Sequence, residues 1–301
     1  MSVQAPSFAG AVSVAQRTNP AWRRFLRNRN GVIGGVVVLV LVISAVFGPS
    51  LAPHDPLRVN PVNAMQPPSW SHPAGTDRLG RDILSRIIHG SRISLQMGFI
   101  AVGIALVAGG ALGLLAGYRG GRLDDVVSFL VNTLLALPGI LLALVIIAAI
   151  GPGLQNVMLA VGISAVPTFA RVVRASTMAA KERAYVEASR ALGCSDLVIV
   201  FRHVLPNILP PIIVLATLGV ATAILAGASV SYLGLGAQPP TPEWGAMVNE
   251  GRTHIRTGWW LATMPGLAIM VTVLGLNLFG DGLRDVLDPR LDALGTSRRS
   301  R

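Results

Sequence analysis

The stretch Tyr185–Val214, YVEASRALGCSDLVIVFRHVLPNILPPIIV, determines how this sequence is interpreted. Its first half is polar and basic, and its second half is apolar enough to enter a membrane. Gly193 follows Glu187–Ser189 after three residues, and Leu205–Pro206 comes later. Glycine permits a tight turn, and a residue before proline tends to leave helical geometry. We therefore expect two short helices that break near Gly193, in a segment that ends at Leu205–Pro206.

The side chains of this segment indicate a docking element. Charged residues alternate with residues that are small or apolar enough to enter a groove on another protein. The predicted contact residues are Glu187, Ala188, Ser189, Arg190, Ala191, Leu192 and Gly193. Such a segment would convert motion of a soluble partner into displacement of the helices that follow it. The alternative is a solvated loop whose arginines only enforce membrane topology.

The composition of the chain is that of a polytopic membrane protein. Of its 301 residues, 52% are hydrophobic and 13% are charged, against roughly 25% charged in soluble domains. Mean hydropathy is +0.60. The net charge of +11 does not indicate nucleic acid as a partner, because aromatics make up only 5% and basic residues sit in short blocks beside apolar runs. The single cysteine, Cys194, excludes an intrachain disulfide.

Six apolar segments are long enough to cross a hydrocarbon core, which needs about 20 residues of helix. Because backbone groups in lipid must be satisfied within the segment, we expect an all-α protein with six transmembrane helices. The predicted spans are residues 31–51, 94–117, 125–150, 154–174, 207–231 and 261–281. Kinks are expected at Pro138–Gly139 and Pro265–Gly266, where proline removes a backbone donor.

Two further patterns concern helix packing and the membrane interface. Small residues recur at every fourth position of the second and fifth spans, which predicts close approach of another helix. They are Ala101, Ala105, Gly109, Gly113 and Gly117, then Gly219, Ala223, Gly227 and Ser231. Trp244, Trp259 and Trp260 lie between the last two spans and are expected to anchor at the membrane interface.

Catalytic chemistry is missing from the sequence. The only lysine, Lys181, follows two alanines, so no G-x-x-x-x-G-K-[ST] phosphate loop exists and the chain is not its own ATPase. The histidines show no metal-ligand spacing, and no metal is predicted. Mid-membrane ionisable residues are nearly absent, which disfavours a secondary carrier, a channel or an intramembrane enzyme.

Several motifs give the sequence a family resemblance. The segment Glu187–Pro206 resembles the EAA loop of ABC-importer permeases, with Ser189 in place of alanine and His203 in place of isoleucine. Four other stretches resemble C-type membrane subunits of dipeptide and oligopeptide importers, and together they cover roughly residues 20–292. These stretches are His72–Arg86, Arg202–Asn207, Leu235–Gly245 and Asn277–Pro289.

The resemblance implies an ABC type I importer permease fold in the bacterial inner membrane, working by ATP-driven alternating access. It implies a heterodimer with a homologous permease, two cytoplasmic ATPase subunits that bind ATP and Mg²⁺, and an extracytoplasmic substrate-binding protein. Contact with lipid is expected, and no cofactor on this chain. The expected substrate is a di- or oligopeptide, and glutathione, nickel chelates and opines remain open. Candidate residues of the substrate path are Asn132, Thr133, Gln238, Trp244 and Asn277.

Charge distribution places both termini in the cytoplasm, since 18 of the 25 basic residues then lie inside. Trp22, Phe25 and Leu26 share one face of an interfacial helix before the first span. The predicted organisation is a cytoplasmic N-terminus with that helix at 1–30, the first span and outer loop at 31–93, the permease core at 94–283 containing a coupling loop at 177–206, and a cytoplasmic tail at 284–301.

Overall fold

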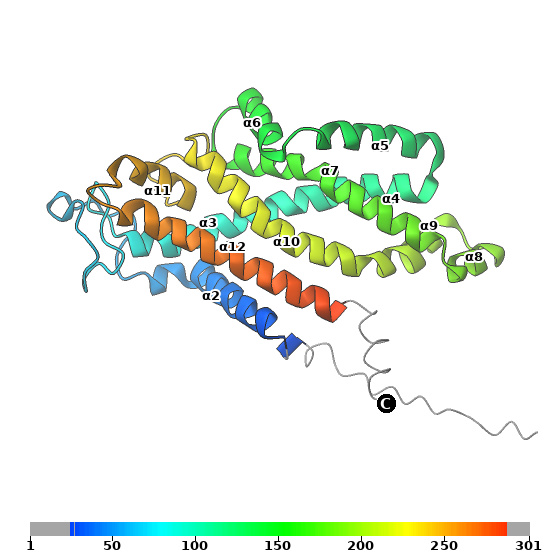
Figure 1. Ribbon diagram of the computed structural model, residues 1–301, viewed down its shortest axis with the longest axis horizontal. Helices are drawn as coiled ribbons and strands as arrows, with labels where there is room; N and C mark the ends of the chain where they lie inside the picture. The colour runs from blue at the N-terminus through cyan, green and yellow to red at the C-terminus, as the bar shows by residue number, and fades with distance from the viewer. Residues whose placement is uncertain (1–24, 27, 288–301) are drawn as a thin grey trace, which may run out of the picture.

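A computed structural model describes residues 25–26 and 28–287, and within these ranges the chain is helical and contains no β-sheet (Figure 1). Long helices run side by side along the longest axis of the molecule, with α11 and the loop 52–82 at one end and α8 at the other. These are called the α11 end and the α8 end. The helices are α2 (Arg29–Leu51), η1 (Pro61–Asn63), α3 (Ile83–Ile104), η2 (Ala105–Gly109), α4 (Gly110–Arg119), α5 (Gly121–Leu135), α6 (Gly139–Ile150), α7 (Leu154–Lys181), α8 (Ala184–Ala191), α9 (Asp196–Val198), η3 (Ile199–Val204), α10 (Leu205–Tyr232), α11 (Trp244–Gly251), η4 (Arg252–His254) and α12 (Trp260–Leu287).

The described residues contain five helical segments long and apolar enough to span a membrane, and α5 with α6 can supply a sixth. The prediction of six spans in an all-α protein is therefore confirmed if that pair counts as one span. Two details differ. The second helix begins at Ile83 rather than near residue 94, because Asp82 caps it by accepting a hydrogen bond from the Ser85 N–H at 2.8 Å. The third predicted span is bent by 91° between α5 and α6.

The prolines inside the predicted spans behave differently from one another. Pro138 has an extended backbone, with φ −55° and ψ 130°, and it separates α5 from α6. The expected kink is therefore a full break. Pro265 lies near the start of α12, which continues without interruption to Leu287, so no break occurs there.

The expected end of the docking segment at Leu205–Pro206 was wrong. Leu205 has helical angles, φ −55° and ψ −47°, and its N–H bonds to the Val200 carbonyl. The preceding turn, η3, is π-helical and leads directly into α10, so one continuous helical segment runs from Asp196 to Tyr232. A π-helical turn shifts bonding to i→i+5, and Pro206 falls in the first turn of α10, where a missing N–H matters least.

The predicted close packing along the small-residue positions is confirmed. A Cβ added at Gly113 would lie 2.4 Å from the Ala170 carbonyl of α7, and one at Gly109 would lie 2.5 Å from the Val166 carbonyl. On α10, a Cβ at Gly227 would collide with Met97 of α3. Backbones therefore approach to distances that only glycine allows.

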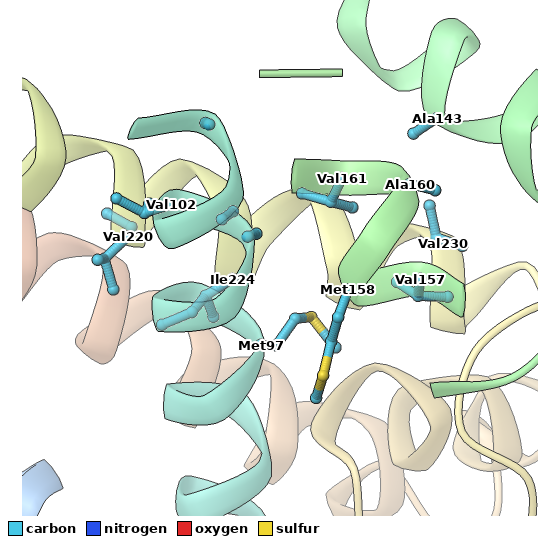
Figure 2. Close-up of a cluster of buried hydrophobic side chains, with 14 of the residues drawn as sticks. Met97, Val102, Ala143, Val157, Met158, Ala160, Val161, Val220, Ile224 and Val230 are labelled. Carbon is cyan, nitrogen blue, oxygen red and sulfur yellow. The ribbon is translucent and has the colours of Figure 1, made fainter. Parts of the chain in front are cut away.

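The main core lies between α3, α7 and α10. Figure 2 shows Met97 of α3 beside Met158 of α7, with Val161 and Ile224 close by, and all four side chains are buried. Interiors of this kind are close-packed, so helix positions are set by side-chain volumes rather than by polar contacts. On the outside of α2, by contrast, large apolar side chains such as Phe47 are exposed, as expected of a surface that faces lipid.

Two expectations about the membrane interface are corrected or fall outside the described residues. Trp244 and Trp260 are buried, at 2% and 6% exposure, so the anchoring prediction was wrong for them; Trp259 is half exposed. The predicted interfacial helix lies almost entirely outside the described residues. Of it, only Phe25 and Leu26 are described, and the Phe25 ring packs edge-on against Phe279 of α12, with 5.6 Å between ring centroids.

Candidate functional site

The short helix α8 protrudes at one end of the molecule, and Val186 is its one buried residue. Val186 is fully buried, in a cluster with Val173 of α7 and Ile199 of η3. A single apolar anchor among polar neighbours fixes which face of α8 points inward. The remaining faces of α8 are left available to another protein.

The break after α8 is a Schellman motif centred on Gly193. The Gly193 N–H bonds to the Arg190 carbonyl at 3.0 Å, and the Cys194 N–H bonds to the Ser189 carbonyl at 3.1 Å. Gly193 has φ 78°, a left-handed conformation that glycine adopts without a steric penalty. The predicted pair of short helices broken near Gly193 is therefore confirmed, and the break is a rigid turn rather than a loose loop.

A hydrogen bond joins the far side of this turn to the core. The Tyr118 hydroxyl at the end of α4 donates to the Asp196 carboxylate at 2.6 Å. Asp196 also begins the helical segment that continues through η3 into α10. The Gly193 turn therefore joins α8 to a continuous helical segment.

The predicted contact residues lie together on the exposed side of α8 and its turn. Ser189 is half-buried and donates its hydroxyl to the Tyr185 carbonyl at 2.8 Å. The exposed members are Glu187, Ala188, Arg190, Ala191, Leu192 and Gly193. One protruding surface thus carries both charge and small side chains.

Sequence reasoning missed two apolar members of this surface. Leu192 is 84% exposed, and beyond the turn Leu197 is 71% and Phe201 is 62% exposed. Leu197 and Phe201 are four residues apart on a helical segment, so they share a face. Exposed apolar side chains beside a charged helix are typical of a docking surface. Their i, i+4 spacing just after Ser195–Asp196 was the available sequence signal.

A second feature is a cavity of 480 Å³ between α3, α6, α7 and α10. Its wall is apolar except for four hydroxyl residues, Ser164, Thr168, Thr222 and Ser229. Three of these bond to carbonyls of their own helices; Ser164, for example, donates to Val161 at 2.8 Å. An apolar wall with few fixed polar groups is typical of a small-molecule path.

None of the five predicted substrate-path residues lines this cavity. Asn132 is exposed on α5 and accepts a hydrogen bond from Arg171 at 2.9 Å, and its exposed neighbour Thr133 bonds to Phe129 of the same helix. Gln238 is exposed near the α11 end, where its amide donates to nearby carbonyls. The other two are the buried Trp244, whose indole N–H donates to the Ile87 carbonyl at 3.0 Å, and the half-buried Asn277 of α12.

At the α11 end, a network of largely buried ion pairs joins two segments of the chain. Asp77 pairs with Arg81 at 2.5 Å and lies 3.8 Å from Arg86, and both arginines reach Glu250 at 3.3 and 3.8 Å. Arg86 is only 1% exposed. These residues belong to the His72–Arg86 stretch and to α11, so the network fixes the loop before α3 against α11.

Glu243 caps α11 from inside the protein. Burial raises the pKa of its carboxyl above the ordinary value, while hydrogen bonds from the N–H groups of Gly245 at 2.9 Å and Ala246 at 2.8 Å act in the opposite direction. The carboxylate satisfies donors that the helix leaves unpaired. The stretch around Glu243 therefore has a structural role, which is to fix the start of α11.

The described residues form a helical bundle with membrane-spanning helices and a short exposed helix, α8, at one end. Residues 109–293 match the family described as binding-protein-dependent transport system inner membrane component, and residues 18–68 match the N-terminal TM domain of oligopeptide transport permease C. The chain belongs to the family of binding-protein-dependent transport system inner membrane components. The prediction of a permease subunit rather than an ATPase is thereby confirmed.

Similar proteins extend over almost the whole chain. The dipeptide transport system permease protein DppC of Alkalihalophilus pseudofirmus is 45% identical over 90% of this chain and 89% of that protein. The di/tripeptide permease DppC of Pseudomonas aeruginosa is 45% identical over 90% of this chain and 91% of its own length. The glutathione permease GsiD of Pectobacterium atrosepticum is also 45% identical, over 90% of each chain.

A solved structure supports the fold. An inward-facing structure of the MetNI methionine ABC transporter matches with a TM-score of 0.57 and 23% identity, covering 68% of this chain and 98% of that one. At this identity the likeness concerns the fold alone. It confirms the predicted ABC importer permease architecture.

Proposed function

We propose that this chain is the permease subunit of an ABC importer that carries dipeptides and other short peptides across the bacterial inner membrane. The names of the relatives support this substrate class, because two are dipeptide or di/tripeptide permeases. Glutathione, which a third relative carries, is itself a tripeptide. One substrate chemistry, a small peptide, thus unites all three relatives.

Coupling to an ATPase is assigned to α8 and its turn, residues 184–193. The observation that carries this assignment is the junction of an exposed docking surface with a continuous helix. Glu187 and Leu192 are exposed, Val186 anchors the helix, and the segment beyond the Gly193 turn continues into α10. Because α10 lines the cavity, displacement of α8 would change the cavity wall.

Membership of the binding-protein-dependent transport family supports the proposed set of partners. Two cytoplasmic ATPase subunits bind ATP and Mg²⁺, and ATP binding favours one of two packings of the helices, as any ligand-driven shift requires. A homologous permease packs beside this chain as a heterodimer, and an extracytoplasmic protein delivers the peptide. We assign the substrate path to the cavity wall, including Ser164, Thr168 and Thr222, in place of the five residues chosen from the sequence.

The α8 end then faces the cytoplasm, as do both termini. A thiol placed at the exposed position 191 tests this orientation. In a Cys194→Ser background, Ala191→Cys should react with a membrane-impermeant maleimide in inside-out vesicles but not in intact spheroplasts. Labelling from the outside would place the docking surface on the wrong side and contradict the proposal.

The coupling assignment is tested by reversing one charge. In a reconstituted importer with its ATPases and binding protein, Glu187→Lys should lower dipeptide uptake roughly tenfold or more, because like charges across an interface cost several kcal/mol. The control is Asp125→Lys, which makes the same charge change at an exposed position of α5. Uptake should remain near wild type in the control.

Expression and thermal stability should be unchanged in both variants, since both sites are exposed. Normal uptake by Glu187→Lys at matched expression would contradict the coupling role. The segment would then be a loop whose arginines only enforce membrane topology. Competition of the labelled dipeptide by glutathione, by nickel chelates and by opines tests the substrate class separately. If no unlabelled peptide competed with the labelled dipeptide, the peptide assignment would be contradicted, and the assignment of the coupling site would not be affected.

A further inference from the structure

Three possible metal ligands from three separate segments meet at the α11 end. His54 follows α2, His72 lies in the loop, and Asp82 caps α3. Their candidate ligand atoms all lie within 4.8 Å of one another. The residues are too far apart in sequence to form a metal-binding motif, so only the fold brings them together.

The distances suit a tetrahedral ion. The Asp82 Oδ1 atom lies 2.9 Å from His72 Nδ1 and 3.8 Å from His54 Nδ1. In a tetrahedral zinc site with bonds of about 2.0–2.1 Å, neighbouring ligand atoms are about 3.3–3.4 Å apart. The two observed distances lie on either side of that value. The two distances from Asp82 therefore lie within about half an ångström of zinc-binding geometry, and the two histidine ligand atoms lie within 4.8 Å of each other.

Ser85 holds two of the three ligands in position. Its N–H and hydroxyl donate to Asp82 Oδ2 at 2.8 and 2.7 Å, which leaves Oδ1 directed at the histidines. The Ser85 hydroxyl also accepts a hydrogen bond from the His54 backbone N–H at 3.0 Å. Hydrogen bonds that fix ligands from behind are a regular feature of protein metal sites.

The site is closed on one side and open on the other. The side chains of Asp82 and His72 are 1% and 10% exposed, whereas that of His54 is 42% exposed. The two imidazole rings lie against each other, with centroids 4.7 Å apart and planes inclined by 33°. An ion can enter past His54, and water can complete the coordination there.

We propose that His54, His72 and Asp82 bind one divalent transition-metal ion, with Zn²⁺ as the fitting species. Two imidazoles and one carboxylate are the nitrogen and oxygen ligands that zinc accepts. On binding, the metal takes the place of the hydrogen bond between His72 Nδ1 and Asp82 Oδ1, and His72 binds as a neutral imidazole whose proton lies on Nε2. The ion would fasten the end of α2 and the loop to the first turn of α3.

The test uses the full-length chain, purified in detergent without a polyhistidine tag and stripped with chelator. Zn²⁺ should bind at one equivalent per chain by isothermal titration calorimetry. Co²⁺ in the same site should give the visible absorption of a tetrahedral ion. Zn²⁺ should also raise the thermal midpoint, because a ligand that binds only the folded state stabilises it.

Two variants locate the site. His54→Ala, at the exposed ligand, should weaken Zn²⁺ binding roughly tenfold or more and abolish the Co²⁺ spectrum, with the helical circular dichroism unchanged. His54→Cys keeps a zinc ligand and should restore binding. His254→Ala serves as the matched control, since His254 lies near the same end and bonds instead to Thr253.

Zn²⁺ binding should be unchanged in His254→Ala. Absence of stoichiometric Zn²⁺ binding to the wild-type chain would overturn the proposal. Equal binding by wild type and His54→Ala would do the same, because the ion would then reside elsewhere. None of these outcomes depends on the transported substrate, so the proposed function stands or falls separately.

Discussion

The two ends of the molecule carry similar kinds of residues and use them in opposite ways. At the α8 end, Glu187, Arg190 and Leu192 are all exposed. At the α11 end, Asp77 and Arg86 point inward and pair with other charges. Both stretches contribute to the family resemblance. Motif residues at one end are thus available to a partner, while those at the other hold the chain together.

This difference determines whether a substitution at each end should lower stability or transport. Exposed ionic groups contribute little to stability, whereas removing one member of a buried ionic network leaves an uncompensated charge in the interior. Substitutions at the α8 end should therefore reduce transport and spare stability. Substitutions at the α11 end should reduce stability first.

The largest expected effect is at Asp77. Asp77→Ala leaves Arg81 and Arg86 facing each other with only Glu250 to balance them, and we expect a loss of about 3–5 kcal/mol. The measurement is thermal unfolding of the purified chain by intrinsic fluorescence. The control is Asp55→Ala, an exposed acid of the same loop that makes one local hydrogen bond, from the Leu57 N–H at 2.9 Å, and its loss should cost about 1 kcal/mol or less. Equal stability of the two variants would remove the contrast between the ends.

A pair of glycines with the same backbone conformation sharpens the comparison. Gly75 and Gly193 have φ of 76° and 78°. At Gly75 a Cβ would lie 2.6 Å from the Trp260 ring, whereas at Gly193 it would meet nothing within 4 Å. Alanine at Gly193 should cost about 1–2 kcal/mol from the left-handed backbone alone. Alanine at Gly75 should cost about 1–3 kcal/mol more from overpacking.

The same unfolding assay measures both glycine variants. Gly193→Asn should recover part of the loss, because asparagine tolerates the left-handed conformation better than alanine. If both alanine variants lost the same stability, the Gly75 contact with Trp260 would contribute nothing.

The smallest expected effect is a pH dependence at Glu243. Since burial raises the pKa of this carboxyl in the folded chain, proton binding favours folding. That contribution is fully present below the ordinary carboxyl value of 4.5 and is lost as pH rises through the raised folded pKa. Glu243→Gln should therefore flatten the fall in thermal midpoint that the wild-type chain shows as pH rises above the ordinary carboxyl value of 4.5. An identical slope in wild type and variant would contradict it.

The chemistry of the sequence was sufficient for features that depend on local or periodic order. Hydropathy located the spanning helices, because the cost of exposing backbone to lipid leaves few alternatives. The four-residue spacing of Gly109, Gly113 and Gly117 predicted close packing, and α7 provides the facing backbone. The turn at Gly193 was predictable because a Schellman motif involves only neighbouring residues.

Other features were decided by contacts between residues distant in sequence. Pro138 predicts some distortion, but the 91° bend depends on how α6 packs on its neighbours. Leu205–Pro206 predicts a helix end, yet a π-helical turn lets the helix continue. The cavity was likewise not visible in the sequence, because its wall is made by four helices at once and no single stretch reveals it.

The amino-acid sequence by itself determined that this chain is a helical membrane permease with a charged segment between two apolar runs, since apolar length, charge and motif spacing are properties of consecutive residues. Only the tertiary structure decided which charged and aromatic residues are inside. Trp244 and the His54–His72–Asp82 cluster acquire their surroundings from segments that meet in space. The physical reason is that burial and coordination depend on distances across the fold, which sequence separation does not specify.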